Sequence, residues 1–298
     1  MSESSEILDW GIAVVRWFQQ FSPSLDLPFK TLTLLGNLEF FLLFMPLLYW
    51  CLDRRIGARL LVLFLMSAYI NSVAKVIAFQ PRPFEYDPAV KALVHAGGGG
   101  FPSGHTQGAV VVWGCIAAEV KKPSMWMLAG FLMVAIPLSR LYLGVHFPTD
   151  LLGGYLIGAA LLLAYLRFAP VIEFELVKRG FRWQMAAAIG LPVGLILLSP
   201  AGARTAVAAG SVLLGFAPGM ILERRWVRFH SGGSTLRRLL RFAVGMVAVV
   251  ALWAGLRVAF AALTSAVFFQ ILCYTLIGLW CSLGAPLLFV RLKLGNAE

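Results

Sequence analysis

The sequence contains few charged residues. Asp, Glu, Lys and Arg make up 13% of its 298 residues, whereas roughly 25% is usual in soluble proteins. A soluble fold of this length would need more polar side chains than this to cover its surface. With 60% hydrophobic residues and a mean hydropathy of +0.83, the composition excludes an ordinary soluble domain and predicts that most of the chain lies in lipid.

Two further absences narrow the class of protein. The four cysteines lie in apolar runs, and no two have the spacing of a metal site or a CxxC motif. We therefore expect these cysteines to be small, buried hydrophobic side chains. The first fifteen residues contain three acidic residues and no Lys or Arg. A secretory signal peptide begins with positive charge, and we therefore predict that no signal is removed.

Nine apolar stretches have about the length needed to cross a bilayer as helices. A hydrocarbon core of ~30 Å needs roughly 20 apolar residues, with a range of about 17 to 25. The stretches run from Thr31 to Cys51, Ile56 to Phe79, Gly104 to Ala118, Met125 to Leu143, Leu151 to Phe168, Trp183 to Leu198, Thr205 to Leu222, Phe242 to Leu263 and Ala266 to Val290. We predict an all-α, polytopic membrane helix bundle with about nine transmembrane helices.

Basic residues are concentrated in every second loop between these spans. Every second loop, together with the C-terminal tail, holds 17 of the 25 Lys and Arg residues, and the positive-inside rule assigns such loops to the cytoplasm. The net charge of +11 is therefore mainly a topology signal. These short loops are not expected to form the basic, aromatic surface that binds nucleic acid, so membrane lipids are the predicted partners.

An apolar stripe at helical spacing precedes the first span. Its members are Trp10, Ala13, Val14, Trp17, Phe18 and Phe21, with polar residues on the opposite side. This pattern is typical of an amphipathic helix that lies on a membrane surface. We expect an amphipathic N-terminal segment over residues 1–30.

Polar residues gather in three short segments at the ends of spans: 75–83, 101–105 and 139–150. Each segment alone fits a snorkelling side chain, a helix cap or a polar loop. The alternation of loops assigns all three to the extracytoplasmic side. Together they supply three cations, two histidines, a hydroxyl group and a carboxylate, which are Lys75, Arg82, Arg140, His105, His146, Ser103 and Asp150.

The predicted ligand of these residues is a phosphate. Lys75, Arg82 and Arg140 outnumber the nearby acids, and guanidinium groups match tetrahedral oxyanions. A helix that begins at Gly104 would add free N–H groups and the positive end of its dipole. Because three cations would repel a divalent ion, we expect neither a metal nor another cofactor.

His146 is the predicted nucleophile. Asp150 follows it by four residues, so the carboxylate can accept the Nδ1–H and leave a lone pair on Nε2. Attack on phosphorus would form a phosphohistidine, while His105 protonates the departing oxygen and later takes a proton from water. The phosphate charge would be held by Lys75, Arg82, Ser103, Gly104 and Arg140.

The pattern K-x6-R-P, P-S-G-H and S-R-x5-H-x3-D, from Lys75 to Asp150, resembles the type 2 phosphatidic acid phosphatase superfamily. The resemblance implies metal-independent monoesterase or diphosphatase chemistry through a phosphohistidine. It assigns His146 as nucleophile, Asp150 as its partner, His105 as acid and base, and the same five residues as phosphate ligands. We accordingly predict a catalytic helical core over 31–170 and additional C-terminal transmembrane helices over 183–290.

Several alternatives remain open at this point. Residues 35–82 resemble the sphingosine-1-phosphate phosphatase branch, and their spacing is similar to the glucose-6-phosphatase branch. The implied substrate is a lipid phosphate or diphosphate, with a soluble sugar phosphate, a phosphotransferase and a transporter or scaffold as alternatives. Residues 84–100 form either a lid or a slack connector. Short loops without a glycosylation sequon favour a bacterial inner membrane with the site facing the periplasm.

Overall fold

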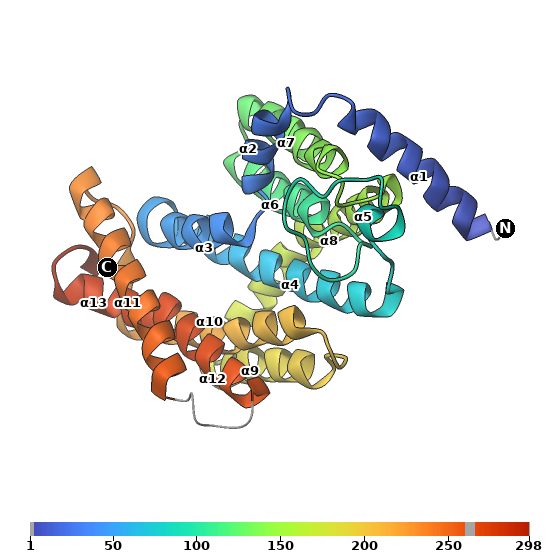
Figure 1. Ribbon diagram of the computed structural model, residues 1–298. Coiled ribbons are helices and arrows are strands. Elements are labelled where there is room, and N and C mark those ends of the chain that lie inside the picture. Colours follow the sequence, from blue (N-terminus) through green and yellow to red (C-terminus); the bar gives the residue numbers. More distant parts are fainter. Residues whose placement is uncertain (1–2, 260–265, 298) are drawn as a thin grey trace. The chain divides into compact units, whose positions relative to one another are not determined.

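The computed structural model describes residues 3–259 and 266–297. These residues are almost entirely helical, with two π-helical segments (η) and one pair of antiparallel two-residue strands (Figure 1). This confirms the predicted all-α class. The elements are α1 (Glu3–Gln19), α2 (Asp26–Leu34), α3 (Leu38–Leu47), η1 (Leu48–Leu52), α4 (Arg54–Ala78), α5 (Pro83–Tyr86), α6 (Gly104–Val120), α7 (Pro123–Tyr142), α8 (Pro148–Lys178), α9 (Phe181–Leu197), α10 (Arg204–Trp226), β1 (Phe229–His230), α11 (Thr235–Ala259), α12 (Ala266–Leu279), η2 (Trp280–Gly284), α13 (Ala285–Arg291) and β2 (Asn296–Ala297).

Six helical stretches in the described residues are long and apolar enough to cross a membrane. A seventh is possible if α2 and the segment Leu38–Leu52, which meet at a 47° bend, form one span. The other two predicted spans correspond to α6 and α9, which have 17 residues each. At 1.5 Å per residue such a helix is about 26 Å long, slightly shorter than the hydrocarbon core. The protein is thus a polytopic helical protein, and the number of nine spans remains a prediction.

The chain forms two compact units. Unit 1 comprises Met1–Leu42 and Ile70–Leu166, and unit 2 comprises Leu43–Tyr69 and Arg167–Glu298. The predicted division into 1–30, 31–170 and 183–290 follows the order of the sequence, whereas these units each contain two separate stretches of it. All eight predicted site residues belong to unit 1.

The centre of unit 1 is α6. Its side chains are buried from Thr106 to Ala117, and the chain then turns at Lys121, whose φ of 58° is left-handed. Pro123 begins α7, where the missing N–H of proline has no helical partner to lose. A buried helix beginning at Gly104 places the P-S-G-H segment inside the unit rather than on its surface.

Helix α1 lies along the edge of unit 1 (Figure 1) and has two apolar sides. Ile12 and Val15 are buried and belong to a cluster that contains Phe147 and Leu151. The predicted stripe faces outward instead, since Trp10 and Trp17 are 57% and 56% exposed. The structure has a helix at this place, and its amphipathic character and its position on a membrane surface remain predictions.

Unit 2 is held together by aromatic packing and close helix contacts. Its core contains Tyr49, Trp50, Phe216 and Phe289. At Gly215 a Cβ atom would collide with the backbone of α12, so glycine is needed for α10 and α12 to approach this closely. Among the cysteines of the chain, Cys51, Cys115 and Cys273 are buried, as predicted, whereas Cys281 is only partly buried.

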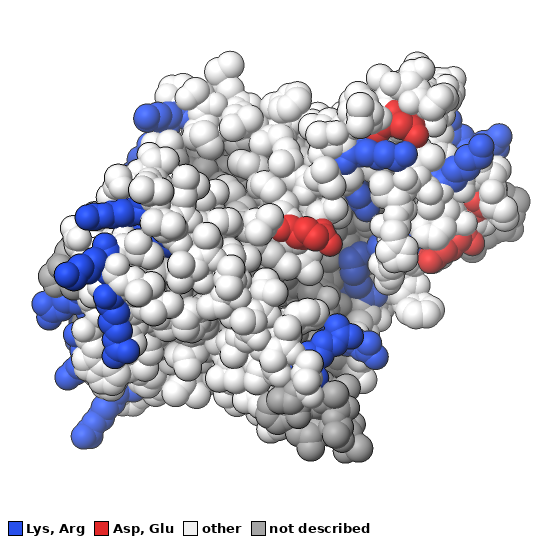
Figure 2. Space-filling model, turned by 60° about the vertical axis from the view of Figure 1, so that its left-hand side comes forward, with Lys and Arg blue, Asp and Glu red and all other residues white. Residues whose placement is uncertain are grey.

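The surface carries few charges. On the face drawn in Figure 2 most of the area is uncharged, with Lys and Arg side chains at its left edge and others within its right-hand half. Large apolar side chains such as Phe131, Leu163 and Leu197 are more than half exposed. Such a surface would be unstable in water and is suited to contact with lipid.

Candidate active site

A buried histidine–carboxylate pair lies just before and within the first turn of α8. The Nδ1 atom of His146 is 3.0 Å from Oδ2 of Asp150, and the two residues are only 2% and 0% exposed. The same carboxylate oxygen accepts the backbone N–H of Phe147 at 2.9 Å. Donation by Nδ1 leaves the lone pair on Nε2, which lies 3.4 Å from Nη1 of Arg82.

Lys75 and Arg82 contact the four consecutive glycines. The ammonium group of Lys75 donates to the carbonyls of Gly99 at 2.5 Å and Gly100 at 3.2 Å. Arg82 donates from Nη2 to Gly97 and from Nε to Gly98, at 2.8 and 3.0 Å. Carbonyl oxygens therefore use donors that a phosphate would need, and a bound phosphate would compete with this loop.

Ser103 and Gly104 form the N-terminus of α6. The Ser103 side chain caps the helix by accepting the N–H of Thr106 at 3.4 Å, and its backbone N–H donates to the carbonyl of Asp150 at 2.9 Å. This bond ties the start of α6 to the start of α8. The helix N-terminus thus lies beside the histidine–carboxylate pair, where its dipole favours an anion.

Arg140 and His105 both contact the break between α2 and α3. Nη1 of Arg140 donates to the hydroxyl of Thr33 at 2.5 Å, and Nε2 of His105 lies 2.9 Å from Oδ1 of Asn37. Arg140 is 4% exposed, and its Nε atom has no hydrogen-bond partner among the described residues. An unsatisfied buried guanidinium N–H is a donor available to an anion.

Positive charge dominates the surroundings of His146. Its burial, together with Arg140, Arg82, Lys75 and His105, holds the pKa of His146 well below its usual range. Cations oppose the addition of a proton to the ring, so the neutral imidazole with its free lone pair is favoured. The three-cation cluster, defined as Lys75, Arg82 and Arg140, therefore acts on the same atom that the sequence predicts to be the nucleophile.

Three contacts of the site were not anticipated from the sequence. Gln80 donates from Nε2 to Oδ1 of Asp150 at 2.8 Å, opposite the oxygen that pairs with His146. Thr33 and Asn37 reach Arg140 and His105 from outside the motif segments. The available signals were weak: Gln80 lies between Lys75 and Arg82 in a segment already selected, and Asn37 is a polar residue in an apolar span.

Asn71, another polar residue in an apolar span, supports the site indirectly. Its Nδ2 atom donates to Oε1 of Gln107 at 2.9 Å and to the carbonyl of Pro102 at 3.3 Å. Both acceptors flank the N-terminus of α6. The amide of Asn71 therefore connects α4 to the segment that carries Ser103.

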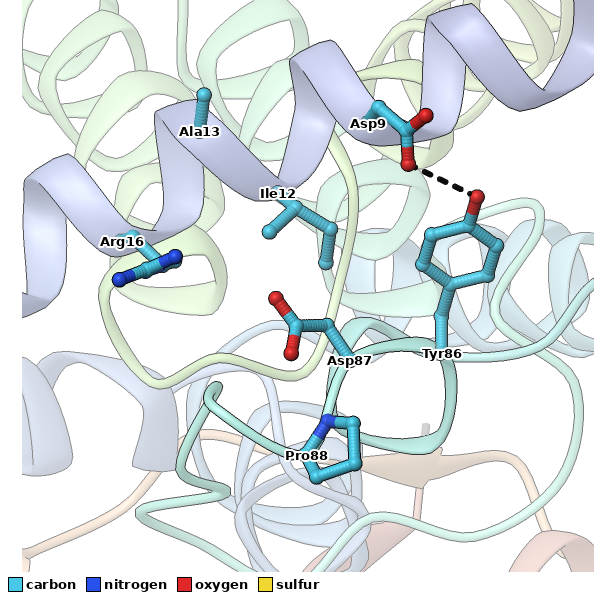
Figure 3. Close-up of a pocket in the computed structure, with 7 residues that line it drawn as sticks. All are labelled: Asp9, Ile12, Ala13, Arg16, Tyr86, Asp87 and Pro88. Carbon is cyan, nitrogen blue, oxygen red and sulfur yellow. Dashed lines mark hydrogen bonds between the residues drawn. The ribbon is translucent and has the colours of Figure 1, made fainter.

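A separate cavity lies between α1 and the segment after α5 (Figure 3). Its volume is about 520 Å³, and it is lined by Asp9, Ile12, Ala13, Arg16, Tyr86, Asp87 and Pro88. The hydroxyl of Tyr86 donates to Asp9 at 3.0 Å. None of the eight predicted site residues lines this cavity, and two carboxylates against one guanidinium make it unsuitable for phosphate.

Two family profiles match the chain. The profile of the PAP2 superfamily, the type 2 phosphatidic acid phosphatases, matches residues 56–173. The profile described as "PAP2 superfamily phosphatase, transmembrane extension" matches residues 207–297. The first match contains all eight predicted site residues, and the second covers most of the C-terminal helices.

Three curated proteins illustrate the similarity. Sphingosine-1-phosphate phosphatase 2 of Mus musculus is 32% identical over 143 residues, or 45% of this chain and 40% of its own. Phosphatidylglycerophosphatase B of Bacillus subtilis is 36% identical over 114 residues, or 35% and 54%. Undecaprenyl-diphosphatase of Sulfolobus acidocaldarius is 32% identical over 108 residues, or 36% and 52%. The chain thus spans about half the length of these relatives.

A crystal structure of a transmembrane PAP2-type phosphatidylglycerolphosphate phosphatase from Bacillus subtilis is also similar. It is 26% identical, with a TM-score of 0.46 over 60% of this chain and 90% of that one.

Proposed function

The chain belongs to the PAP2 superfamily, and from this premise we propose that it is an integral membrane phosphatase that hydrolyses a lipid phosphate or diphosphate. The reaction passes through a phosphohistidine at His146, needs no metal ion, and takes place at the extracytoplasmic end of the helices. The observation that carries the proposal is the buried His146–Asp150 pair facing three cations.

In the first step the phosphate binds to the three-cation cluster, to Ser103 and to the N-terminus of α6. It replaces the glycine carbonyls on Lys75 and Arg82. The lone pair of His146 Nε2 attacks phosphorus, and the bond from phosphorus to the leaving oxygen breaks. His105 gives its proton to that oxygen, while Asp150 stabilises the charge that develops on the imidazole ring.

In the second step water attacks the phosphohistidine in line with the phosphorus–nitrogen bond. His105, now neutral, accepts a proton from the water, and the bond to Nε2 breaks with its electron pair returning to His146. Inorganic phosphate leaves, and His105 is again protonated. Fixed positive charge stabilises the equatorial oxygens in both steps, because phosphoryl transfer depends mainly on positioning and electrostatics.

The membrane setting supports a lipid substrate. Its headgroup would reach the site while its tails remain among the exposed apolar side chains. The outward stripe of α1, with Trp10 and Trp17 exposed, would lie at the interface on the same side as the site, where indole rings are favoured. The proposed location is a bacterial inner membrane with the site facing the periplasm.

The experiment compares phosphate release by the purified full-length protein and its His146→Ala variant in detergent containing EDTA. The substrates are phosphatidate, sphingosine 1-phosphate, undecaprenyl diphosphate and glucose 6-phosphate. We expect release from at least one lipid substrate and none above background from the variant. His95→Ala is the matched control, because His95 is exposed and lies outside the site.

Other outcomes would contradict the proposal or assign a different activity. Equal release by wild type and His146→Ala would exclude the phosphohistidine, and loss of activity in EDTA would exclude the metal-free mechanism. Release from glucose 6-phosphate alone would assign a soluble sugar phosphate. Faster turnover with added glycerol, together with glycerol phosphate as product, would assign a phosphotransferase.

A further inference from the structure

The break between α2 and α3 contacts two residues of the proposed catalytic machinery. Arg140 donates to Thr33 in the last turn of α2, and in the break itself Oδ1 of Asn37 lies 2.9 Å from Nε2 of His105. The break precedes residue 56, where the PAP2 profile begins. The partners that reach Arg140 and His105 therefore lie outside both the motif and the matched profile.

Close packing fixes the position of the break against the imidazole. The backbone turns there through bonds from the N–H of Gly36 to the carbonyl of Thr33 at 3.0 Å and from Asn37 to Leu34 at 3.1 Å. A Cβ atom on Gly36 would lie 2.5 Å from Cδ2 of His105. Glycine at this position lets the chain pass directly beside the ring and brings the next residue, Asn37, to its Nε2 atom.

From this geometry we propose that Asn37 is a positioning residue for the acid–base catalyst His105. The inference rests on the proposed function, in which His105 protonates the leaving oxygen. Asn37 accepts the Nε2–H and so sets the plane of the ring, which leaves Nδ1 as the nitrogen that gives its proton to the leaving oxygen. It acts through His105 and does not touch the phosphate.

The two histidines of the site have chemically different partners. His146 is paired with a carboxylate, which stabilises the positive charge that the ring gains as a nucleophile. His105 is paired with an uncharged amide, which orients the ring without adding negative charge beside the phosphate. A carboxylate at that position would also orient the ring but would oppose the anion that Lys75, Arg82 and Arg140 attract, so the amide positions His105 without weakening phosphate binding.

The dependence of activity on the leaving group distinguishes a role of Asn37 in positioning the acid His105 from a purely structural role. Phosphatidate expels an alcohol oxygen that needs a proton, whereas p-nitrophenyl phosphate expels a stable anion that does not. General acid catalysis contributes about 10²–10⁴-fold, and we expect Asn37→Leu to lower kcat/KM for phosphatidate about tenfold more than for p-nitrophenyl phosphate. The readout is kcat/KM for phosphatidate divided by kcat/KM for p-nitrophenyl phosphate, because kcat/KM reports formation of the phosphohistidine.

Two further variants complete the test. Asn37→Asp keeps an acceptor for the Nε2–H, so the ratio should return to near the wild-type value even if both substrates bind less tightly. Thr31→Val is the matched control, because its hydroxyl bonds only within α2, to the carbonyl of Leu27 at 2.9 Å. It should leave the ratio unchanged.

Equal losses for both substrates in Asn37→Leu would overturn the inference, as would an Asn37→Asp protein that behaves like Asn37→Leu. Wild-type protein that hydrolyses neither substrate nor any of the lipids above would instead overturn the proposed function. The two failures are therefore distinguishable.

Discussion

Two groups of cations in the molecule differ in their partners: the Arg54 and Arg59 side chains of unit 2 and the three-cation cluster of unit 1. The contrast concerns these groups and not the whole units, since the buried Arg241 of unit 2 also donates to backbone carbonyls. In unit 2, Arg54 forms an ion pair with the fully buried Glu223, and Arg59 forms one with Glu173 at 2.5 Å. In unit 1, Lys75, Arg82 and Arg140 bond to carbonyls and a hydroxyl. In the described part of the chain, none of these three side chains has a carboxylate at ion-pair distance.

The difference separates structural charge from charge kept for a ligand. A buried ion pair is neutral overall, and removing one partner leaves the other charge uncompensated. A buried cation without an acid is unfavourable until an anion arrives. The three-cation cluster of unit 1 is therefore expected to be less stable alone than with phosphate bound, whereas the two ion pairs of unit 2 need no ligand.

The largest expected effect is on the stability of unit 2. Arg54→Met leaves Glu223 buried without its cation, which should lower the free energy of unfolding by about 3–5 kcal/mol. Activity per folded molecule should stay within about twofold of wild type, because the pair lies outside the site. Denaturant unfolding in detergent and an active-site-normalised assay would measure both.

The Arg54→Met/Glu223→Leu double variant provides the control for that effect. It removes both charges and should recover most of the lost stability. A double variant as unstable as Arg54→Met would mean that packing, rather than the unpaired carboxylate, causes the loss.

Arg140→Met should have the reverse effects. Losing one positioned donor lowers kcat/KM by about 10²–10³-fold, while the midpoint of thermal unfolding stays the same or rises because an uncompensated buried cation disappears. Assays with phosphatidate and thermal unfolding of the same preparation test this. A lower midpoint would show that Arg140 is structural and would remove the contrast between the two groups of cations.

Phosphate binding should stabilise the protein through unit 1. A ligand at about 100 times its Kd adds roughly 2.7 kcal/mol to the free energy of unfolding, so inorganic phosphate should raise the thermal midpoint. The increase should persist in Arg54→Met and vanish in Arg140→Met. An equal increase in both variants would assign the phosphate to another surface.

The smallest expected effect concerns pH. Burial and the neighbouring cations lower the pKa of His146, so the neutral nucleophile persists in acid and the acid limb of kcat/KM should lie below pH ~6.5. Arg140→Met removes one of these cations, and its acid limb should move to higher pH. Ionisation of the substrate affects wild type and Arg140→Met equally. An acid limb at the same pH in both proteins would therefore show that protonation of His146 does not cause the loss of activity in acid.

Much of the site could be predicted because its signals are local. His146 and Asp150 are four residues apart, so a helix start at Pro148 brings them together. Ser103 and Gly104 begin α6 as the sequence indicated. The outward face of α1 was harder to predict, because both of its sides are apolar and only packing decides that Ile12 and Val15 are the buried ones.

The sequence by itself determined the class of protein, since its apolar spans require lipid and its motif spacing brings the proposed phosphate-binding groups to helix ends. Tertiary structure alone decided which distant residues support them. Gln80 lies 70 residues from Asp150, Asn37 lies 68 from His105, and Thr33 lies 107 from Arg140. Contacts over such separations depend on how helices pack, and composition and local periodicity carry no information about them.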